Sequence, residues 1–450
     1  MPININCFKA YDSRGQVPNQ LNSDVAYRIG NATAEFLGAK RVVVGRDIRL
    51  SSDELTDAVC RGLTDAGVEV LDIGLGGTEI VDFATAHLGA DGGIMVTASH
   101  NPADHNGLKL VREEARPISA DTGLQDIRAL AEKDDRVIVA EAGHRSPTDI
   151  FTSYIDHVLS FVDVPALKSL KLVVNPGNGG AGIAMDGLKN KLPFEFVEVN
   201  YPPDGTFPNG IPNPMLLENQ EVTSKAVIEH EADMGIAWDG DFDRCFLFDE
   251  NGLFIEGYYI VGLLAESILK KNPGEKIVHD PRVIWNTLDI VAGAGGEAVQ
   301  CKSGHSFIKE KMRAADAIYG GEMSAHHYFR DFFYADSGMI PWLLVAELIS
   351  TSGKSLSELV GKRMAMYPAS GEINRQVQDA TATLQALHDR YAEDALFVDD
   401  IDGYCFEFAN WRFNIRMSNT EPVVRLNVET RGDAVLLADK TKEVLAVLDP

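Results

Sequence analysis

The sequence predicts an α/β protein of several domains, in which three similar mixed α/β blocks precede a smaller α+β domain. The first reason is length, because 450 residues exceed the roughly 250–300 residues at which one hydrophobic core stops growing. The second is an alternation of short β-branched runs with helix-compatible stretches, which is typical of βαβ units. We expect four domains, at 1–145, 146–250, 251–367 and 368–450.

Each block can be justified from its own strands. The first contains RVVVGRD, VEVLDIG and GGIMVTA, and the stretch DELTDAVCRGLTDAG has the spacing of an amphipathic helix. In the second block the same parts are played by LKLVVN, FEFVEVN, MGIAW and CFLFDE, and in the third by KIVHD, GEAVQC and AIYGG. The last block begins with a helical stretch and ends in two alternating runs, WRFNIRMS and VVRLNVET. The first three blocks therefore form a structural repeat.

The most polar sequence of each repeat follows its late apolar strand. These three segments are TASHNP, DGDFDR and GEMSAHH. In parallel α/β sheets, ligands bind beyond the carboxyl ends of the strands. We expect the three loops to be analogous and to converge on one cleft.

Charge and cysteine content exclude several functional classes. The chain has 41 Lys and Arg against 67 Asp and Glu, a net charge of -26, which repels nucleic acid and anionic membranes. An anionic ligand would need a local cluster of Arg and Lys. The five cysteines are scattered, the N-terminus lacks a signal-peptide pattern, and the most apolar run contains Glu347. We expect a cytoplasmic protein with neither a nucleic-acid nor a membrane partner.

The strongest chemical signal is an acidic loop that follows the apolar run MGIAW. Asp239, Asp241 and Asp243 alternate along a turn opened by Gly240, so their oxygens can meet at one hard cation such as Mg²⁺. A solvated acidic turn and an EF-hand are the alternatives. An EF-hand would need glycine where Arg244 stands.

Ser99 lies in a loop that suits a nucleophile. Pro102 biases Asn101 away from helix, so Ser99 should be exposed, with His100 beside it. Acyl transfer has weak support, because Ser99 is not in a GxSxG elbow. Taken alone, the motif also fits an ordinary loop serine or a Ser–His hydrogen bond, and the acidic loop favours catalysis.

Two further segments suit a sugar phosphate. Glu322 and Ser324 would share a face of an extended loop and could bind paired hydroxyls, although the neighbouring histidines could instead bind a metal. In the fourth block a guanidinium, two hydroxyls and an amide form a plausible phosphate cradle, unless they are an Asn/Thr turn with a surface arginine. The cradle residues are Arg416, Ser418, Asn419 and Thr420, and further cations are Arg14, Lys109 and Arg425.

A glycine-rich loop points to a different enzyme class. Gly177, Gly179 and Gly182 fit G-x-G-x-x-G directly after LKLVVN, and Glu198 ends the next predicted strand. This pattern is shared with dinucleotide-binding sites and would support an NAD-dependent dehydrogenase. A structural glycine loop is the other interpretation.

Taken together, the motifs YDSRG, TASHNP, DGDFDR, GEMSAHH and RMSNTEP resemble those of the α-D-phosphohexomutase family, in the same order over essentially the whole chain. Within that family, GEMSAHHYFRDF is similar to the bacterial phosphomannomutases that feed GDP-mannose and exopolysaccharide synthesis. The resemblance implies four domains around a central cleft and a mutase that acts on hexose phosphates. It would require Mg²⁺, with hexose 1,6-bisphosphate as intermediate and activator.

The resemblance also implies a role for each matched residue. Ser99 would carry the phosphoryl group, and its phosphate would share Mg²⁺ with the three aspartates. Arg244 and Lys109 would steady the transferring group, and general acid–base help could come from His326, His100 or Lys109. The substrate would contact Tyr11, Arg14, Glu322, Ser324, Arg416, Ser418, Asn419 and Thr420. Ser13, where many relatives have Ile, is the one departure from the motifs.

Overall fold

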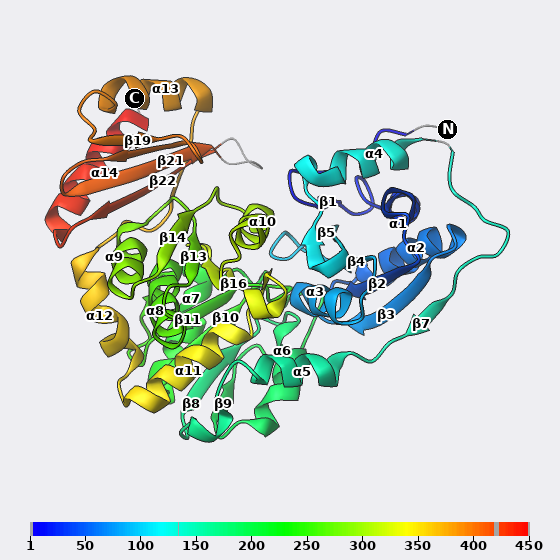
Figure 1. The fold of residues 1–450 in the computed structure, drawn as a ribbon, viewed down its shortest axis with the longest axis horizontal. Helices are drawn as coiled ribbons and strands as arrows, with labels where there is room; N and C mark the ends of the chain where they lie inside the picture. Colours follow the sequence, from blue (N-terminus) through cyan, green and yellow to red (C-terminus); the bar gives the residue numbers. More distant parts are fainter. Residues whose placement is uncertain (1–2, 134, 418–422, 449–450) are drawn as a thin grey trace. The chain divides into compact units, whose positions relative to one another are not determined.

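The computed structural model describes residues 3–133, 135–417 and 423–448. It divides into two compact units, whose helices and strands are labelled in Figure 1. The first unit contains the chain up to Phe254 together with Tyr328–Lys354, and the second contains Ile255–His327 together with the chain from Ser355 onwards. Across the described residues, every helix is too short or too polar to cross a membrane.

The first sheet has the order β1-β5-β4-β2-β3-β7, with β6 paired to β5. Strands β2, β3, β4 and β7 run parallel, whereas β5 is antiparallel to its neighbours. The strands are β1 (Ser13–Gln16), β2 (Arg41–Arg46), β3 (Glu69–Leu75), β4 (Gly92–Val96), β5 (His105–Arg112), β6 (Arg116–Pro117) and β7 (Arg145–Pro147). The helices are α1 (Ser23–Leu37), α2 (Ser52–Asp65), α3 (Thr78–His87) and α4 (Gln125–Glu132).

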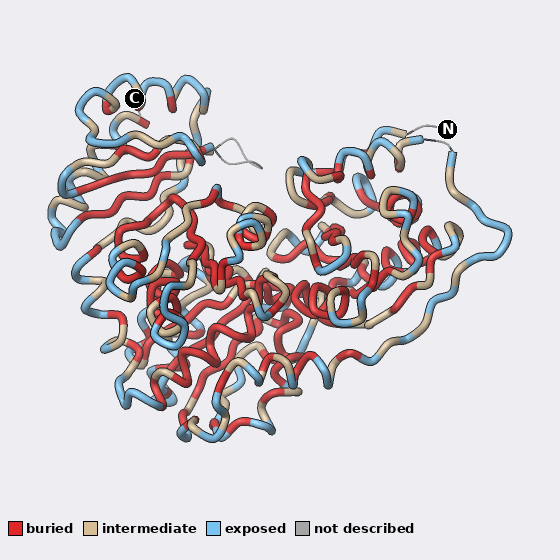
Figure 2. Tube along the Cα trace, in the orientation of Figure 1, coloured by how far each residue is buried: buried red, intermediate tan, exposed pale blue. Residues whose placement is uncertain are grey.

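The ends of α1 show how local sequence sets these elements. Asn22 caps the helix by accepting hydrogen bonds from the backbone N–H groups of Asp24 and Val25. Gly38 ends the helix in the left-handed region at φ 57°, which glycine adopts without a steric penalty. Apolar residues of α1, α2 and α4 share one core with residues of the strands, and α4 packs against α1. Figure 2 shows how much of the chain is buried.

The second sheet has the order β12-β11-β10-β8-β9. Strands β8, β9 and β10 are parallel, and β11 is antiparallel to β10. They are β8 (Lys171–Asn175), β9 (Glu195–Glu198), β10 (Met234–Trp238), β11 (Cys245–Phe248) and β12 (Phe254–Ile255). The accompanying helices of the first unit are α5 (Phe151–Leu159), α6 (Ala181–Leu188), α7 (Leu217–Glu229) and α11 (Ile340–Ser352).

The third sheet has the order β14-β13-β15-β16-β17. Strands β13, β14 and β15 are parallel. They are β13 (Lys276–His279), β14 (Glu297–Gln300), β15 (Tyr319–Gly321), β16 (His327–Phe329) and β17 (Ala335–Asp336). The helices of this part in the second unit are α8 (Gly257–Lys271), α9 (Trp285–Gly293), α10 (His305–Ala315) and α12 (Leu356–Met366).

The three sheets confirm the structural repeat. If the strands of each block are counted from its first parallel strand, the spatial order is second, first, third, fourth: β3-β2-β4-β5, β9-β8-β10-β11 and β14-β13-β15-β16. In every block the polar loop singled out in the sequence connects the third strand to the fourth. The three loops are therefore analogous in topology.

The C-terminal part is a smaller α+β layer of different design. Its five strands are all antiparallel, in the order β18-β22-β21-β20-β19. They are β18 (Ile373–Gln376), β19 (Phe397–Asp399), β20 (Tyr404–Glu407), β21 (Trp411–Met417) and β22 (Val423–Thr430), with α13 (Ala380–Tyr391) and α14 (Ala434–Leu448). Aromatic and aliphatic side chains of the strands and both helices form one core.

Candidate active site

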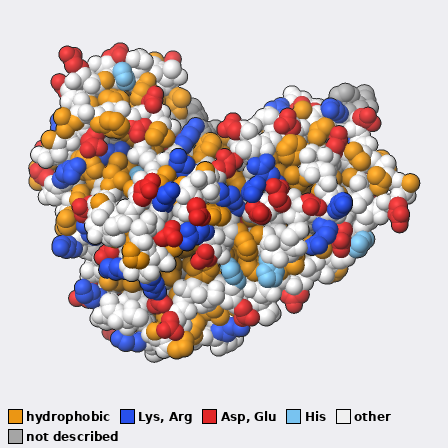
Figure 3. Space-filling view, in the orientation of Figure 1, with side chains coloured by type: hydrophobic (Ala, Val, Ile, Leu, Met, Phe, Trp, Pro, Cys, Tyr) orange, Lys and Arg blue, Asp and Glu red, His pale blue; other side chains and the backbone are white. Residues whose placement is uncertain are grey.

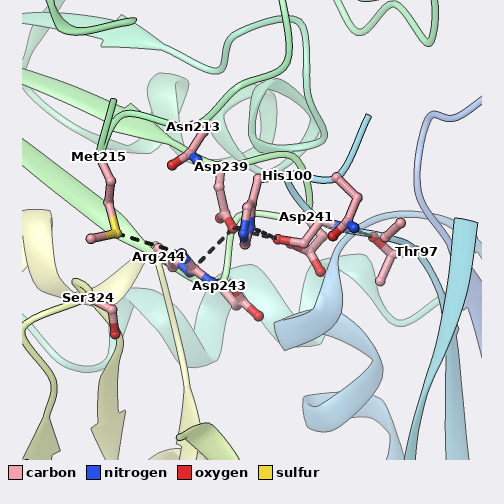
Figure 4. Close-up of polar contacts among 12 residues, drawn as sticks. Thr97, His100, Asn213, Met215, Asp239, Asp241, Asp243, Arg244 and Ser324 are labelled. Atoms are coloured by element: carbon pink, nitrogen blue, oxygen red, sulfur yellow. Dashed lines mark hydrogen bonds and ion pairs between the residues drawn. The ribbon is translucent and has the colours of Figure 1, made fainter. Parts of the chain in front are cut away.

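The acidic loop of the first unit begins where β10 ends. Asp239, Asp241 and Asp243 alternate with Gly240 and Phe242, and all three carboxylate side chains are buried. One oxygen of each aspartate lies within 4.8 Å of the others. Figure 4 shows the three side chains gathered in one place, with Arg244 and His100 beside them.

Phe242 fixes the loop in this conformation. Its backbone lies in the left-handed region at φ 48°, which costs a non-glycine residue about 1–3 kcal/mol and must be stabilised by its surroundings. Its buried ring packs against Gly77 and Gly180, where a Cβ atom would collide with it. Alternate residues of the loop therefore have different surroundings. The phenylalanine ring packs against glycines, whereas the three carboxylates lie together.

The three carboxylates fit a divalent cation. Within the described residues, Oδ1 of Asp239 and Oδ1 of Asp241 are buried without a hydrogen-bond donor. Buried polar atoms are rarely left in this way unless a ligand completes them. All the candidate ligand atoms are oxygens, which Mg²⁺ prefers.

The electrostatics of the trio are uneven. Burial, together with the charges of Asp243 and Asp241, raises the pKa of Asp239 to about 7. Burial and Asp243 act in the same direction on Asp241, but Lys109 and the hydroxyl of Thr78 outweigh them, so the pKa of Asp241 is lowered. The site therefore holds excess negative charge that a cation would relieve.

Lys109 is the cation that the fold itself supplies. It lies on β5, and its Nζ donates to Asp241 Oδ2 at 2.7 Å and to Asp243 Oδ2 at 2.6 Å. Although burial opposes the charged form, the two carboxylates raise the pKa of Lys109. The side chain thus remains an ammonium group and cannot serve as a base near neutral pH.

Ser99 lies directly beside the trio. Its Oγ donates to Asp239 Oδ2 at 2.7 Å and lies 3.0 Å from His100 Nδ1. The expectation that Ser99 is exposed is wrong, because the acidic loop covers it and the residue is buried. Its backbone has φ 50°, a second left-handed non-glycine conformation. A Cβ at Gly240 would collide with the Ser99 carbonyl oxygen. The glycine is therefore what allows the serine loop and the acidic loop to approach.

Arg49 holds the serine loop in its strained shape. Its Nη2 donates to the carbonyl oxygens of Ser99 at 2.9 Å and Asn101 at 2.6 Å, and its Nη1 to those of Pro102 and His105. Asp47 lies 3.3 Å from Arg49 Nε and accepts the hydroxyl proton of Thr97. A buried ion pair at the end of β2 thus supports the loop that carries Ser99.

The other expected residues of the first unit lie around this centre. Arg244 Nε is 3.5 Å from Asp239 Oδ2, and Arg14 Nη1 donates to Asn101 Oδ1 at 2.8 Å. Tyr11 lies, half-buried, in the segment before β1. Burial and the charge of Arg244 lower the pKa of His100 well below its usual value, so this imidazole is neutral.

The glycine-rich loop is explained by packing rather than by a dinucleotide. Gly180 N–H donates to the Gly240 carbonyl oxygen at 3.0 Å, and a Cβ at Gly179 would lie 3.0 Å from the same oxygen. A Cβ at Gly182 would lie 2.8 Å from the Tyr201 carbonyl oxygen. The loop supports the acidic loop from behind, and nothing found here supports the NAD-dependent dehydrogenase alternative.

The second unit contains the loop expected to bind hydroxyl groups. Glu322 is buried, and its carboxylate accepts a hydrogen bond from Gly304 N–H at 2.8 Å and lies 3.3 Å from His326 Nδ1. The same His326 nitrogen lies 3.0 Å from Ser324 Oγ. His327 is buried, and its Nδ1 lies 2.7 Å from the hydroxyl oxygen (Oη) of Tyr319. Three of the expected residues are therefore connected.

Arg416 lies at the end of β21 in the second unit, and its Nη2 is 3.1 Å from Glu372 Oε2. Ser418, Asn419 and Thr420 lie outside the described residues. Near Arg416 is Arg282, a buried arginine that bridges Asp280 and Glu372 and lies 3.4 Å from Ser324 Oγ.

Four residues at these sites were not predicted from the sequence: Arg49, Thr78, Arg282 and Glu372. Arg49 and Arg282 each stand three residues after a first parallel strand, β2 and β13. The rule that ligands collect at carboxyl ends of strands could have found both. Thr78, whose Oγ1 donates to Asp241 Oδ2 at 2.6 Å, begins α3. Its partner is 163 residues away, so no local pattern indicates the contact.

The sequence matches four family models along nearly its whole length. These are phosphoglucomutase/phosphomannomutase α/β/α domain I at residues 6–137, domain II at 152–252, domain III at 256–367 and the C-terminal domain at 372–447. Only short connecting segments fall between the matches.

Full-length relatives and a solved structure agree with the family models. The chain is 60% identical over 453 residues to a phosphomannomutase of Salmonella montevideo and 58% identical over 452 residues to one of Escherichia coli K12, with 99% of each chain covered. The crystal structure of a phosphoglucomutase/phosphomannomutase family protein from Burkholderia thailandensis is 34% identical, with a TM-score of 0.87 and coverage of 100% of this chain and 99% of that one.

Proposed function

The chain belongs to the phosphoglucomutase/phosphomannomutase family, and we propose that it interconverts mannose 6-phosphate and mannose 1-phosphate through a phosphoserine at position 99. Full-length similarity to phosphomannomutases supports this substrate. The enzyme is an isomerase, an intramolecular phosphotransferase. Glucose phosphates form the second substrate pair of the proposal, in keeping with the family description.

One observation carries the proposal: the Ser99 hydroxyl donates to Asp239 at 2.7 Å, at the edge of three buried carboxylates. Phosphoryl transfer requires a positioned oxygen and compensation of the charge on the transferred group. A buried, strained serine beside a cation-binding cluster meets both needs. This arrangement distinguishes Ser99 from an ordinary loop serine.

We assign Mg²⁺ to Asp239, Asp241 and Asp243, whose oxygens lie within 4.8 Å of one another. When bound, Mg²⁺ would neutralise charge on the phosphoryl group. The chain contributes further positive charge through Lys109 and Arg244, which already contact the carboxylates. Arg49 and Gly240 keep Ser99 Oγ in place, so little reorganisation is needed during transfer.

Proton movements are assigned to histidines. His100 Nδ1 lies 3.0 Å from Ser99 Oγ, and the imidazole is neutral. Once the hydroxyl turns its proton from Asp239 towards Nδ1, His100 can accept that proton when Ser99 is phosphorylated. Lys109 stays charged and is assigned an electrostatic role only. We assign proton transfer to and from the sugar hydroxyl to His326, which contacts Glu322 and Ser324.

Recognition of the sugar is assigned to Glu322 and Ser324, and binding of the phosphate that does not react to Arg416 with Ser418, Asn419 and Thr420. Arg14 and Tyr11 complete the proposed substrate contacts. Hexose 1,6-bisphosphate is the proposed activator because it can phosphorylate Ser99. A cytoplasmic location is part of the proposal, supported by five buried cysteines without a disulfide.

The test is conversion of mannose 1-phosphate to the 6-phosphate with Mg²⁺ and a trace of hexose 1,6-bisphosphate. We expect Ser99→Ala to lose activity by on the order of 10³-fold or more, because no other group carries the phosphate. The control is Ser160→Ala, since Ser160 lies in an exposed turn of the same unit. An active Ser99→Ala enzyme would refute the phosphoserine role.

A further inference from the structure

A second charge cluster lies wholly within the second unit and is centred on a glutamate. Three guanidinium groups surround the Glu372 carboxylate. Arg416 Nη2 lies 3.1 Å and Arg282 Nη1 3.4 Å from Oε2, and Arg425 Nη1 lies 3.3 Å from Oε1. The mechanism above gives no role to Glu372.

The cluster is largely closed to water. The side chains of Arg282, Arg416 and Glu372 are 3%, 10% and 8% exposed, whereas that of Arg425 is 27% exposed. Among the described residues, the buried Nε groups of Arg282 and Arg416 have no hydrogen-bond acceptor. Because these buried N–H groups lack an acceptor, the arginines can donate to more anionic oxygen atoms than Glu372 provides.

Backbone pairing forces the two arginines of the sheet together. Arg416 on β21 stands directly opposite Arg425 on β22, and like charges in this relation repel. Gly371 turns at φ 70°, and Asn427 Nδ2 donates to its carbonyl oxygen at 3.0 Å. This turn brings Glu372 onto the arginines just before β18 begins.

The cluster has further acidic neighbours on the side of Arg282. Asp280 Oδ2 lies 2.7 Å and Glu322 Oε1 lies 3.7 Å from Arg282 Nη2. Burial acts to raise the pKa of Glu372, but Arg282, Arg416 and Arg425 outweigh it, so its pKa is lowered and it stays ionised. A phosphate brought to these arginines would therefore meet an ionised Glu372 already in contact with all three guanidinium groups.

We propose that Glu372 is a positioning residue that competes with the substrate's non-reacting phosphate for Arg282, Arg416 and Arg425. The inference rests on the proposed function, which assigns that phosphate to Arg416. In the free enzyme, Glu372 holds the guanidinium groups ready and offsets their repulsion. In the complex it shares them with the phosphate and thereby weakens phosphate binding. The bisphosphate intermediate must turn over, so that one phosphate leaves the arginines and the other takes its place. Weaker phosphate binding would make this exchange faster.

The competition can be measured without catalysis. The probe is inorganic phosphate, titrated by calorimetry into full-length protein that carries Ser99→Ala, in EDTA so that no metal contributes. Adding Glu372→Gln should lower the Kd for phosphate by about three- to tenfold, because the competing charge is gone. Glu372→Asp keeps the charge but on a shorter side chain, which competes less well for the arginines. Its Kd for phosphate should therefore lie between that of the unaltered site and that of Glu372→Gln.

Steady-state kinetics give a second test. If Glu372 only supported the structure, its loss would not lower KM. In the otherwise unaltered enzyme, Glu372→Gln should lower both the KM for mannose 1-phosphate and kcat. The control is Glu407→Gln, since Glu407 on β20 lies 3.8 Å from Arg431 instead, and it should leave both unchanged.

An unchanged or raised Kd for phosphate in Glu372→Gln would overturn the proposal, and so would a Kd for Glu372→Asp above that of the unaltered site. If the Gln variant fails to fold, the Asp variant decides alone. A failed mutase assignment would show instead as absent isomerisation by the unaltered enzyme. The two failures are therefore distinguishable.

Discussion

In the first unit three carboxylates gather beside one lysine, whereas in the second unit three guanidinium groups gather around one glutamate. Each cluster is built around one side chain of the opposite sign, Lys109 or Glu372. Further counter-charges lie at its edge, namely Arg244 in the first unit and Asp280 and Glu322 in the second. The fold thus prepares two ligand sites of opposite charge, each with an internal counter-ion. One is set for a cation and the other for an anion.

Both clusters are largely closed to water. Lys109 and the aspartates are 10% exposed or less, and so are Arg282, Arg416 and Glu372, whereas Arg425 at the rim of the second cluster is 27% exposed. An interior position makes a charge costly to leave unpaired, so changes at Arg425 should cost the least stability. On the face shown in Figure 3, acidic and basic side chains are otherwise interspersed.

The largest expected effect is that of Lys109→Met. Removing the ammonium leaves Asp241 and Asp243 facing each other without their partner, which should lower the free energy of unfolding by about 3–5 kcal/mol in EDTA. Mg²⁺ should recover part of the loss. Chemical unfolding in EDTA and in Mg²⁺ measures both values.

Lys189→Met is the control, since Lys189 pairs with Asp186 and Glu198 at the surface and should cost about 0–1 kcal/mol. Equal losses for the two variants, or a Lys109→Met loss that Mg²⁺ leaves unchanged, would mean that the first cluster is not a cation site.

Gly240→Ala tests how closely the two loops of the first unit must approach. The new methyl group would collide with the Ser99 carbonyl oxygen. Overpacking should cost about 1–3 kcal/mol, and displacement of the serine by about 1 Å should lower kcat by on the order of 10²-fold. Mutase assays with thermal unfolding check both.

Gly361→Ala is the matched control, because a Cβ there meets nothing within 4 Å on α12. It should raise stability by about 0.5–1 kcal/mol and leave activity unchanged. Full activity of Gly240→Ala would show that the contact between the loops is unnecessary for transfer.

Glu79 is a buried carboxylate whose hydrogen-bond donors are all neutral. It shows how burial shifts a pKa where no charged partner compensates, in contrast to the two clusters. Tyr154, Ser337 and the Gly338 N–H donate to it, and burial raises its pKa from 4.5 to about 8. Between these values the unfolded chain has lost the proton and the folded chain has kept it. Stability should therefore fall as pH rises through this window, by at most about 1.4 kcal/mol per unit.

In Glu79→Gln this contribution disappears. The difference in unfolding free energy between the unaltered protein and the variant should shrink steadily from pH 5 to pH 8 and level off above, as measured by chemical unfolding. Parallel pH curves for the two proteins would contradict the raised pKa.

The smallest effects are expected at the rim of the second cluster. Arg425→Lys should raise the KM for mannose 1-phosphate by about two- to threefold, and Arg416→Lys by about tenfold, because the more buried guanidinium makes the stronger charge-assisted contacts. Steady-state kinetics compare the two. The reverse order would argue against Arg416 as the principal phosphate contact.

Much of the fold could be predicted because its parallel strands are short and rich in β-branched residues. RVVVGRD, LKLVVN and KIVHD each became the first parallel strand of a sheet. β5 was overlooked, since its buried residues do not alternate with exposed ones. As a result Lys109 could be named as a cation but not placed on a strand.

The site was predictable where chemistry is concentrated in a few adjacent residues, as in the acidic loop. It was not predictable where partners are distant. Glu79 contacts Ser337 across 258 residues, and Glu372 meets Arg282 across 90. Such pairs have no local signature, because the tertiary fold alone brings them together.

The phosphoserine at position 99 is best tested by the mass of the protein after incubation with hexose 1,6-bisphosphate and Mg²⁺, followed by peptide mapping. We expect an addition of about 80 Da, located on the peptide that contains Ser99 and absent from Ser99→Ala. A phosphate on another residue, or an active enzyme that never carries one, would contradict it.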